Sequence, residues 1–321
     1  MEWVACNLCG SNRLTPVYEM PDRRFFPREF FTVVECDECG LGFVNPRPSR
    51  DEIQRHYPPE YFEDPGTQSH ARCLRRRCSE KAKYLREVEQ PGREPLLLDV
   101  GCANGDFLRF MAARGWRVEG VEVAESSRPI QDFKVYRQQF TDIPVNQPTY
   151  DAVTAWAVLE HVHDPMAYFR KAGAILKPGG LFVFLAPNFE SLASRCLFCE
   201  DVPRHLYFFT RKTVRQYLDA AGLTLEMEDN NRNVYKMAPY NWLAYQYKTR
   251  LRKREFTFQD VKVTYREYLQ LHRLPRGFAS TLRHAAYAPS AVLDRILWPV
   301  IENVQILRKT YGNSTFVARK P

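Results

Sequence analysis

The sequence contains no apolar run long enough to cross a bilayer, and residues 1–16 do not form a recognisable secretory signal. A membrane-spanning helix needs roughly 20 consecutive apolar residues, and no stretch of this chain approaches that length. The 9 cysteines therefore occur in a sequence without an export signal. These absences exclude a helical membrane span and predict a reduced, cytoplasmic protein.

The composition is that of a soluble globular protein. With 321 residues, 45% hydrophobic and 26% charged, the chain is long enough for two or three lobes. The net charge of +8 is unevenly distributed. Residues 236–321 hold 16 Lys and Arg against 5 Asp and Glu, a surplus of +11 that leaves −3 for residues 1–235. The basic surplus thus belongs to the C-terminal segment.

Residues 96–105, Leu-Leu-Leu-Asp-Val-Gly-Cys-Ala-Asn-Gly, predict a cofactor-binding turn. The apolar start of this stretch fits a buried parallel strand. Gly101 and Gly105 allow positive φ and let a ligand approach the bare backbone. A second strand over 116–122 ends in Glu122, at the point where a doubly wound fold uses an acid to hold ribose hydroxyls.

The glycine spacing separates this loop from a dinucleotide site. A dinucleotide fingerprint has the form Gly-x-Gly-x-x-Gly, whereas the loop from Asp99 to Gly105 has the form Asp-x-Gly-x-x-x-Gly. An acid before the turn suits a cationic ligand such as an amino group beside a sulfonium. Here the sequence resembles the class I S-adenosylmethionine (SAM) dependent methyltransferases. The resemblance continues through residues 150–165 and the Leu-Lys-Pro-Gly-Gly turn at 176–180.

This resemblance covers roughly residues 96–225 and implies an α/β fold, with a Rossmann-like sheet that carries helices on both faces. It also implies SAM as the cofactor. A generic α/β domain with glycines at this spacing is the alternative, because the spacing alone is weak evidence. The residues predicted to surround the cofactor are Asp99, Gly101, Cys102, Ala103, Gly105, Glu122, Asp142 and Trp156.

Two cysteine pairs near the start of the chain, Cys6 with Cys9 and Cys36 with Cys39, predict a zinc site. Four thiolates fit tetrahedral zinc, and a glycine after each pair allows the tight turn that such a site needs. Four sulfur ligands leave no open coordination position, so the predicted zinc is structural. The 26 residues between the pairs exceed the usual ribbon spacing of about 15–20. Disulfides or a redox pair are the alternatives.

The region that follows, through residue 62, resembles the zinc-binding leader of one methyltransferase group. That group often lies among genes for surface polysaccharides and modified sugars, which implies a small-molecule, glycan or lipid-linked acceptor. The predicted organisation is a zinc-binding lobe over 1–62, a linker helix over 63–93, a SAM-binding core over 94–230, a basic helical cap over 231–312 and a last core strand over 313–321.

The cap is predicted to contain helices over 261–271 and 291–307. The second helix has an apolar stripe that we interpret as facing the core, although Pro299 would kink it; contact with a membrane surface or lipid tail is the alternative. The basic run over 248–254 is suited to phosphates of a nucleotide sugar, a lipid or RNA, or is simply a solvated face. RNA is the less favoured partner, because the sequence contains no recognisable RNA-binding module. The oligomeric state is left open. The apolar stripe consists of Val292, Leu293, Ile296, Leu297, Val300, Ile301, Val304 and Leu307.

Two histidines are predicted to serve the chemistry. SAM supplies an electrophilic methyl group, and the protein must orient a nucleophile and remove its proton. His205 lies in Pro-Arg-His-Leu-Tyr-Phe-Phe-Thr, which resembles an element of the same group, and the ordinary imidazole pKa near 6.5 suits a base. His161 is the second candidate and is expected chiefly to shape the cofactor pocket. A structural role is the alternative for both.

The predicted function is therefore SAM-dependent O-methylation of a sugar-containing or lipid-linked small molecule by direct in-line transfer. One alternative is an RNA base methyltransferase that docks through the zinc lobe and the basic cap. Another is a non-catalytic scaffold that retains the SAM fold, although the intact Asp99, Gly101, Gly105 and Glu122 argue against decay of the site.

Overall fold

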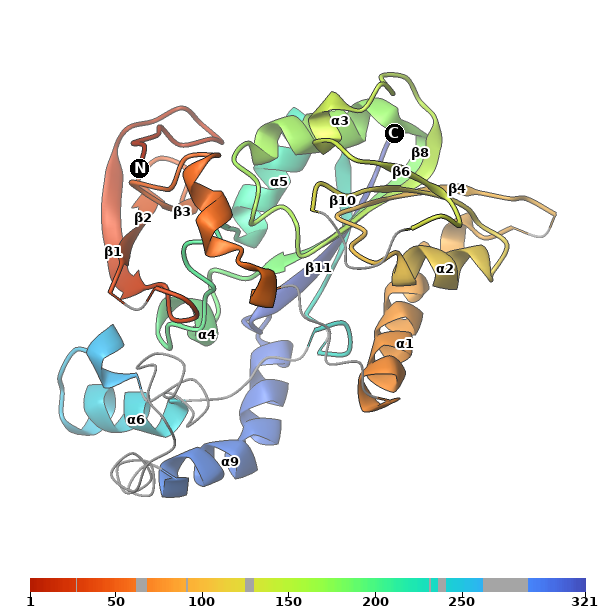
Figure 1. The fold of residues 1–321 in the computed structure, drawn as a ribbon. Helices are drawn as coiled ribbons and strands as arrows, with labels where there is room; N and C mark the ends of the chain where they lie inside the picture. Colours follow the sequence, from red (N-terminus) through yellow and green to blue (C-terminus); the bar gives the residue numbers. More distant parts are fainter. Residues whose placement is uncertain are drawn as a thin grey trace. The chain divides into compact units, whose positions relative to one another are not determined.

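The computed structural model describes residues 1–26, 28–61, 68–90, 92–124, 130–230, 232–235, 241–261 and 288–321. The chain forms two compact units (Figure 1). The first contains residues 1–57, 188–210 and 237–312, and the second contains 58–187, 211–236 and 313–321. Among the described residues, no helix is long and apolar enough to cross a membrane.

The second unit is built on a seven-stranded sheet in the order β10-β11-β8-β7-β4-β5-β6. Neighbouring strands from β8 to β6 are parallel, whereas β11 runs antiparallel to both of its neighbours. The chain runs outward from β4 through β5 to β6 and then returns to β7 on the other side of β4, which makes the carboxyl end of β4 a topological switch point. The strands are β4 (Leu96–Val100), β5 (Arg117–Val121), β6 (Lys134–Tyr136), β7 (Tyr150–Trp156), β8 (Leu176–Pro187), β10 (Thr224–Asp229) and β11 (Asn313–Arg319).

Helices cover both faces of this sheet, with α1 and α2 on one side and α3 and α5 on the other (Figure 1). The near-continuous apolar strands β4 and β7 are buried on both faces, as parallel strands between helices must be. The predicted α/β fold class is therefore confirmed. The helical elements are α1 (Gln68–Ala82), η3 (Lys83–Val88), α2 (Asp106–Ala112), η4 (Phe140–Asp142), α3 (Pro165–Ile175) and α5 (Arg211–Ala220), with the short η2 (Pro59–Tyr61).

The first unit has a four-stranded antiparallel sheet in the order β1-β2-β3-β9. Strand β9 comes from far along the chain and pairs with β3 through Phe208 opposite Gly42. Residues 1–62 are called the leader below. The core of this unit joins Phe31 and Val33 of the leader to Phe208 and to Phe256 of the C-terminal segment. Its elements are β1 (Leu14–Pro21), β2 (Phe30–Cys36), β3 (Gly42–Val44), η1 (Glu52–His56), α4 (Leu192–Arg195) and β9 (Tyr207–Phe208).

The grouping of segments differs from the predicted domain boundaries. Residues 1–57 of the predicted zinc lobe and most of the predicted cap fall in the same unit, together with residues 188–210 from the predicted core. The C-terminal part of this unit contains α6 (Trp242–Gln246), η5 (Tyr247–Leu251), η6 (Phe258–Asp260) and α9 (Ala288–Leu307). The helix predicted over 261–271 falls, apart from Val261, outside the described residues.

Helix α9 corrects the prediction that its apolar stripe faces the core. Asp294 and Glu302 are 1% and 2% exposed, whereas Ile296 and Val300 are 64% and 66% exposed. The polar face is therefore the buried one. Pro299 lies inside the helix, and α9 bends along its length in Figure 1.

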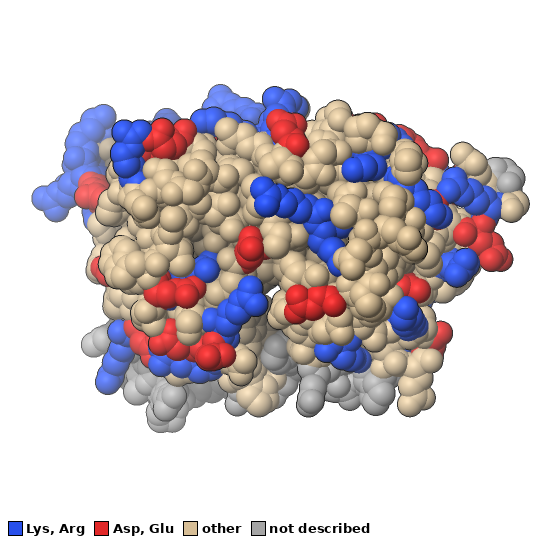
Figure 2. Space-filling model, turned by 90° about the horizontal axis from the view of Figure 1, so that it is seen from above, with Lys and Arg blue, Asp and Glu red and all other residues tan. Residues whose placement is uncertain are grey.

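Acidic and basic side chains are interspersed on the face shown in Figure 2. Among the described residues of that face, the surplus of Lys and Arg in the sequence does not merge into one continuous basic surface. Charge on this face therefore gives no reason to expect a broad nucleic-acid footprint there.

Candidate functional site

The glycine loop follows β4 at the switch point of the second unit. Gly101 and Gly105 adopt φ of 68° and 77°, in the left-handed region that favours glycine. The amides of Gly101 and Cys102 both donate to the carbonyl of Val121, at 2.8 and 3.1 Å. A Cβ added at Gly101 would lie 2.6 Å from Cγ2 of Val158. The turn is therefore tight, and a side chain at Gly101 would displace its neighbour.

Glu122 follows the end of β5 and reaches this loop. Its carboxylate accepts hydrogen bonds from the backbone amides of Ala103 and Ala124, each at 2.8 Å. These two bonds hold the carboxylate beside the loop and leave lone pairs on both oxygens for further donors. The sequence-predicted Gly101, Ala103 and Glu122 are thus brought together at one edge of the sheet.

Asp99 is buried at the end of β4, where it is 3% exposed. Its Oδ1 accepts a hydrogen bond from Thr154 at 2.5 Å. Burial raises the pKa of Asp99 to about 6, against the opposing effects of the Lys81 ammonium and the Thr154 hydroxyl. Burial likewise lowers the pKa of Lys81, and the nearby Asp99 charge counteracts that shift. Asp99 is therefore a buried carboxylate with the half-buried ammonium of Lys81 as a nearby opposite charge.

The raised pKa of Asp99 predicts a specific pH dependence of stability. The ordinary aspartate value near 3.9 lies below the folded value of about 6, so the folded state binds the proton more tightly. The contribution of Asp99 to stability is then fully present below about pH 4 and is lost as the pH rises through about 6. We expect Asp99→Asn to remove this slope in urea unfolding measured between pH 4.5 and about 7.5. Parallel profiles for the two proteins would contradict the assignment.

Trp156, at the end of β7, contributes an unpaired donor to the same region. Its Nε1 is buried without a hydrogen-bond partner among the described residues, a state that costs free energy unless a ligand or water accepts from it. Its ring packs edge-on against Phe107 and lies 4.9 Å from Nζ of Lys81. The orphaned donor, the bare glycine backbone and the Glu122 carboxylate together fit a polar cofactor.

Two other residues predicted to surround the cofactor have different surroundings. The side chain of Cys102 belongs to the hydrophobic core, and burial raises its pKa to about 12. Asp142 ends η4 on the surface, where its carboxylate accepts a hydrogen bond from Thr141 at 2.9 Å. Cys102 thus contributes its backbone, and not its side chain, to the glycine loop.

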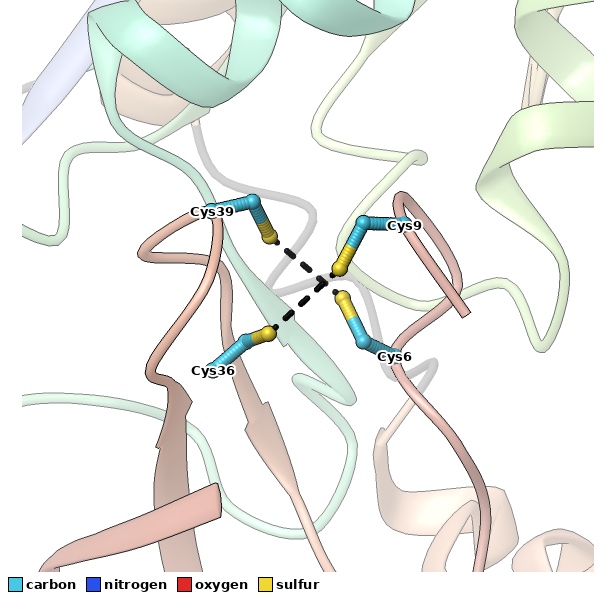
Figure 3. A group of neighbouring side chains, drawn as sticks. All are labelled: Cys6, Cys9, Cys36 and Cys39. Carbon is cyan, nitrogen blue, oxygen red and sulfur yellow. Dashed lines mark hydrogen bonds between the residues drawn. The ribbon is translucent and has the colours of Figure 1, made fainter. Parts of the chain in front are cut away.

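The four predicted zinc ligands converge in the first unit (Figure 3). Their sulfur atoms all lie within 4.8 Å of one another. Sγ of Cys6 is 3.5 Å from that of Cys39, and Sγ of Cys9 is 3.5 Å from that of Cys36. A tetrahedral ion with Zn–S bonds of about 2.3 Å places its sulfurs about 3.8 Å apart, so the four cysteines fit zinc without rearrangement.

The turns behind these cysteines have the geometry that the sequence predicts. Gly10 and Gly40 adopt φ of 76° and 81°, and their amides donate to the carbonyls of Cys6 and Cys36, both at 2.8 Å. All four cysteines are free thiols, not disulfides. Burial raises the pKa of Cys6 to about 11, so a cation is needed to hold this sulfur as a thiolate.

His205 lies in the first unit, just before β9, and has a carboxylate partner. Nδ1 of His205 is 2.7 Å from Oε2 of Glu200. The Glu200 side chain is 3% exposed and that of His205 is 17% exposed. A buried carboxylate at this distance fixes the proton on Nδ1, so Nε2 is the basic nitrogen of the neutral ring. The amide of Asp201 also points at Nδ1, but at 3.5 Å it is the weaker contact. His161 follows β7 in the second unit, where its amide donates to the Val158 carbonyl at 2.9 Å.

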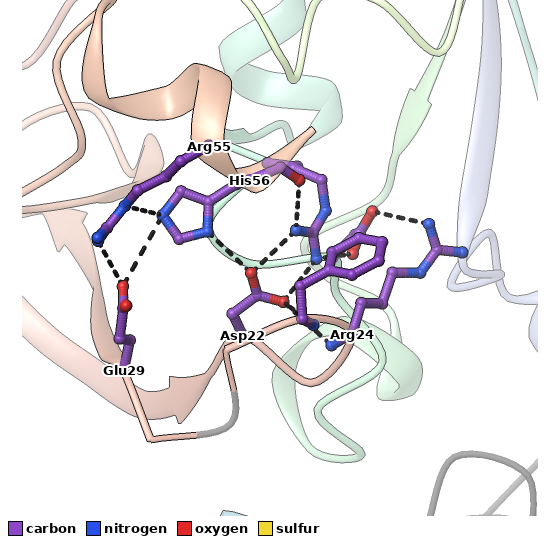
Figure 4. Close-up of polar contacts among 8 residues, drawn as sticks. Asp22, Arg24, Glu29, Arg55 and His56 are labelled. Atoms are coloured by element: carbon purple, nitrogen blue, oxygen red, sulfur yellow. Dashed lines mark hydrogen bonds and ion pairs between the residues drawn. The ribbon is translucent and has the colours of Figure 1, made fainter. Parts of the chain in front are cut away.

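A buried charge network holds the segment that carries His205 (Figure 4). Arg204 donates to both oxygens of Asp22, at 3.0 and 2.9 Å, and to Asp201 at 2.7 Å. Asp22 is also 2.8 Å from Nδ1 of His56. Burial opposes the charge on Asp22, but the hydrogen bonds from His56 and Arg204 hold its pKa well below the ordinary value. The segment before His205 is therefore fixed to the leader by buried ion pairs that would be costly to break.

Sequence reasoning missed three residues of these sites: Lys81, Glu200 and Arg204. Lys81 stands among many Lys and Arg residues of α1, so nothing in the sequence separates it from the solvated ones. Glu200 lies five residues before His205 in a stretch without helical or strand periodicity. Glu200 could have been predicted from its position in the sequence, because it is an acid close to the candidate base His205.

Comparisons with known proteins find methyltransferases. A family model described as a methyltransferase domain matches residues 70–228. The chain is 38% identical over 106 residues to a ubiquinone biosynthesis O-methyltransferase of Xanthomonas campestris, covering 29% of this chain but only 42% of that protein. It is 30% identical over 175 residues to the protein of the same name in Ruegeria pomeroyi, covering 48% and 68%.

Among solved structures, a Burkholderia thailandensis 1,6-didemethyltoxoflavin-N1-methyltransferase with bound S-adenosylhomocysteine matches with a TM-score of 0.43 and 16% identity, over 60% of this chain and 89% of that one. The Ruegeria match covers more than two thirds of that relative at 30% identity, and the methyltransferase-domain match contains the glycine loop and Glu122. The chain belongs to the methyltransferase-domain family of class I SAM-dependent methyltransferases.

Proposed function

We propose that the protein transfers a methyl group from SAM to an oxygen of a small molecule that is sugar-containing or lipid-linked. The observation that carries the proposal is the Glu122 carboxylate held against the glycine loop at the switch point of a sheet from this family. The relatives named above are O-methyltransferases by name, which supports oxygen as the acceptor atom.

The residues at the switch point would hold the cofactor in distinct ways. Glu122 would accept the ribose hydroxyls, because a carboxylate pairs well with two vicinal donors. The bare backbone at Gly101 would let the cofactor approach, and Nε1 of Trp156 would gain an acceptor. SAM, when bound, supplies an electrophilic methyl group on a positively charged sulfur.

His205 would act as the general base, with Glu200 as its positioning residue. The short contact from Glu200 to Nδ1 would stabilise the imidazolium that forms when Nε2 takes the acceptor's proton. The Arg204 network would keep the segment rigid, because a base must be held within a fraction of an ångström of its substrate. Cys6, Cys9, Cys36 and Cys39 would hold one structural zinc ion.

The acceptor class is proposed from the names of the relatives and from the resemblance of the leader. The names of the relatives point to ubiquinone biosynthesis and give no support to the expectation of polysaccharide biosynthesis. A lipid-linked acceptor is compatible with those names, and a sugar acceptor rests on the resemblance of the leader alone. The proposed substrate class therefore needs a direct test.

The test is transfer of radiolabelled methyl from SAM by the zinc-loaded protein into a lysate separated into RNA, nucleotide-sugar and lipid-extractable pools. Label in the sugar or lipid pool supports the proposal and identifies the substrate class. Label confined to nuclease-sensitive material would make the protein an RNA methyltransferase. No label in any pool, with SAM bound, would favour a scaffold that only retains the fold.

The assignment of Glu122 predicts a defined loss of cofactor affinity. Glu122→Ala should weaken SAM binding by about 1–3 kcal/mol, because charge-assisted hydrogen bonds to the ribose are lost. Isothermal titration calorimetry with SAM measures this directly. Because Glu122 also accepts the amide of Ala103, Glu122→Gln serves as the matched variant that keeps one acceptor oxygen. Wild-type affinity in Glu122→Ala would refute the assignment.

A further inference from the structure

Helix α9 exposes a broad, largely apolar face, in which Asn303 is also exposed. Seven large aliphatic side chains on it are more than one third exposed. At 3.6 residues per turn they lie within an arc of about 140°. Single exposed aliphatic residues need no explanation, but a contiguous set of this size marks an interaction surface. The set consists of Val292, Leu293, Ile296, Leu297, Val300, Val304 and Leu307, and we refer to it as the α9 apolar face.

The orientation of this face is fixed by the opposite side of the helix. Oδ1 of Asp294 accepts the amide of Leu243 at 2.9 Å, and Oε1 of Glu302 accepts the hydroxyl of Tyr311 at 3.0 Å. Trp298 is buried on the same side. Rotating the helix to bury its aliphatic residues would break these bonds and expose Trp298, so the fold itself directs the apolar face outward.

The exposed charged side chains of α9 and of the two residues after it are positive. Both acids of α9 are on the buried side, whereas Arg295, Arg308 and Lys309 are exposed. Helix α6 packs against α9. The basic run that follows α6 exposes four further cations. That run also exposes Leu251 (75%) and Tyr247 (55%). The four cations of the run are Arg250, Arg252, Lys253 and Arg254.

We propose that the α9 apolar face docks on the surface of an anionic phospholipid bilayer. Aliphatic side chains on one helix face insert into the boundary between headgroups and acyl chains, while nearby Lys and Arg attract anionic headgroups. A second copy of the chain fits the charges less well, because self-association through this face would bring the same cationic surroundings together. The proposal goes beyond the methyl-transfer function and does not depend on it.

The test is co-sedimentation of the zinc-loaded protein of 321 residues with vesicles of phosphatidylcholine, with and without phosphatidylglycerol. We expect binding to the anionic vesicles only, and its loss when salt rises from about 0.1 to about 1 M, which shortens the screening length from about 10 to about 3 Å. The double variant Ile296→Glu with Val300→Glu should bind at least about tenfold more weakly. Met227→Glu, on the exposed side of β10, is the matched control and should bind as wild type.

Three results would overturn the proposal. The first is the absence of wild-type binding to anionic vesicles, or equal binding to neutral ones. The second is a marked fall in melting temperature of the double variant, which would show that protein covers the face in the folded chain. The third is a dimeric wild type and monomeric double variant in light scattering, which would assign the face to a second copy.

Discussion

Cys36→Ser is expected to remove one equivalent of zinc and to unfold the leader of the first unit. Structural zinc in finger peptides contributes about 10–16 kcal/mol of apparent binding free energy, which exceeds the 2–5 kcal/mol or so lost with a single large core side chain. Cys6 and Cys9 precede β1, Cys36 ends β2 and Cys39 lies in the turn before β3, so the ion would join two separate turns of the chain.

The measurement combines metal content by mass spectrometry with thermal unfolding. Cys73→Ser is the matched control, because Cys73 is exposed on α1 and lies outside the group of four sulfurs. It should keep the zinc and the wild-type melting temperature. If Cys36→Ser keeps both as well, the four cysteines do not hold a structural metal.

The part of the fold that follows local sequence patterns was predictable. The strands around Asp99 and Glu122 and the turn between Gly101 and Gly105 are each specified within a few residues by apolar runs and glycines. The same holds for the cysteine pairs, because each turn closes within five residues. Local spacing constrains these features strongly, so they can be predicted without knowledge of the rest of the chain.

Long-range pairing could not be predicted in the same way. The two-residue strand β9 pairs with β3 over a separation of more than 160 residues, and no pattern of two residues specifies a partner. The network of Asp22 and Arg204 depends on the same pairing. For α9, the helical periodicity of the sequence separates an apolar face from a polar face, but it does not show which of the two the protein buries. That choice is made by Leu243 and Tyr311, which bond to its acids.

His205→Ala is expected to lower kcat by about 100-fold or more while leaving SAM affinity unchanged. General bases contribute roughly 10²–10⁴-fold to rate, and the cofactor contacts proposed for Glu122 and Gly101 do not include this histidine. Calorimetry and single-turnover rates separate the two quantities. An equal loss of affinity and rate, with a lower melting temperature, would instead make His205 a structural residue.

Glu200→Gln tests whether the buried carboxylate acts through His205. Without its negative charge the imidazolium is less stable, so the acidic limb of the kcat pH profile should move to lower pH and kcat should fall by more than KM changes. Glu190→Gln, which alters an exposed carboxylate of the same segment, should leave the profile unchanged. A merely structural Glu200 would change stability and leave the pH profile where it is, because the hydrogen bond at 2.7 Å from Nδ1 would then have no effect on proton transfer.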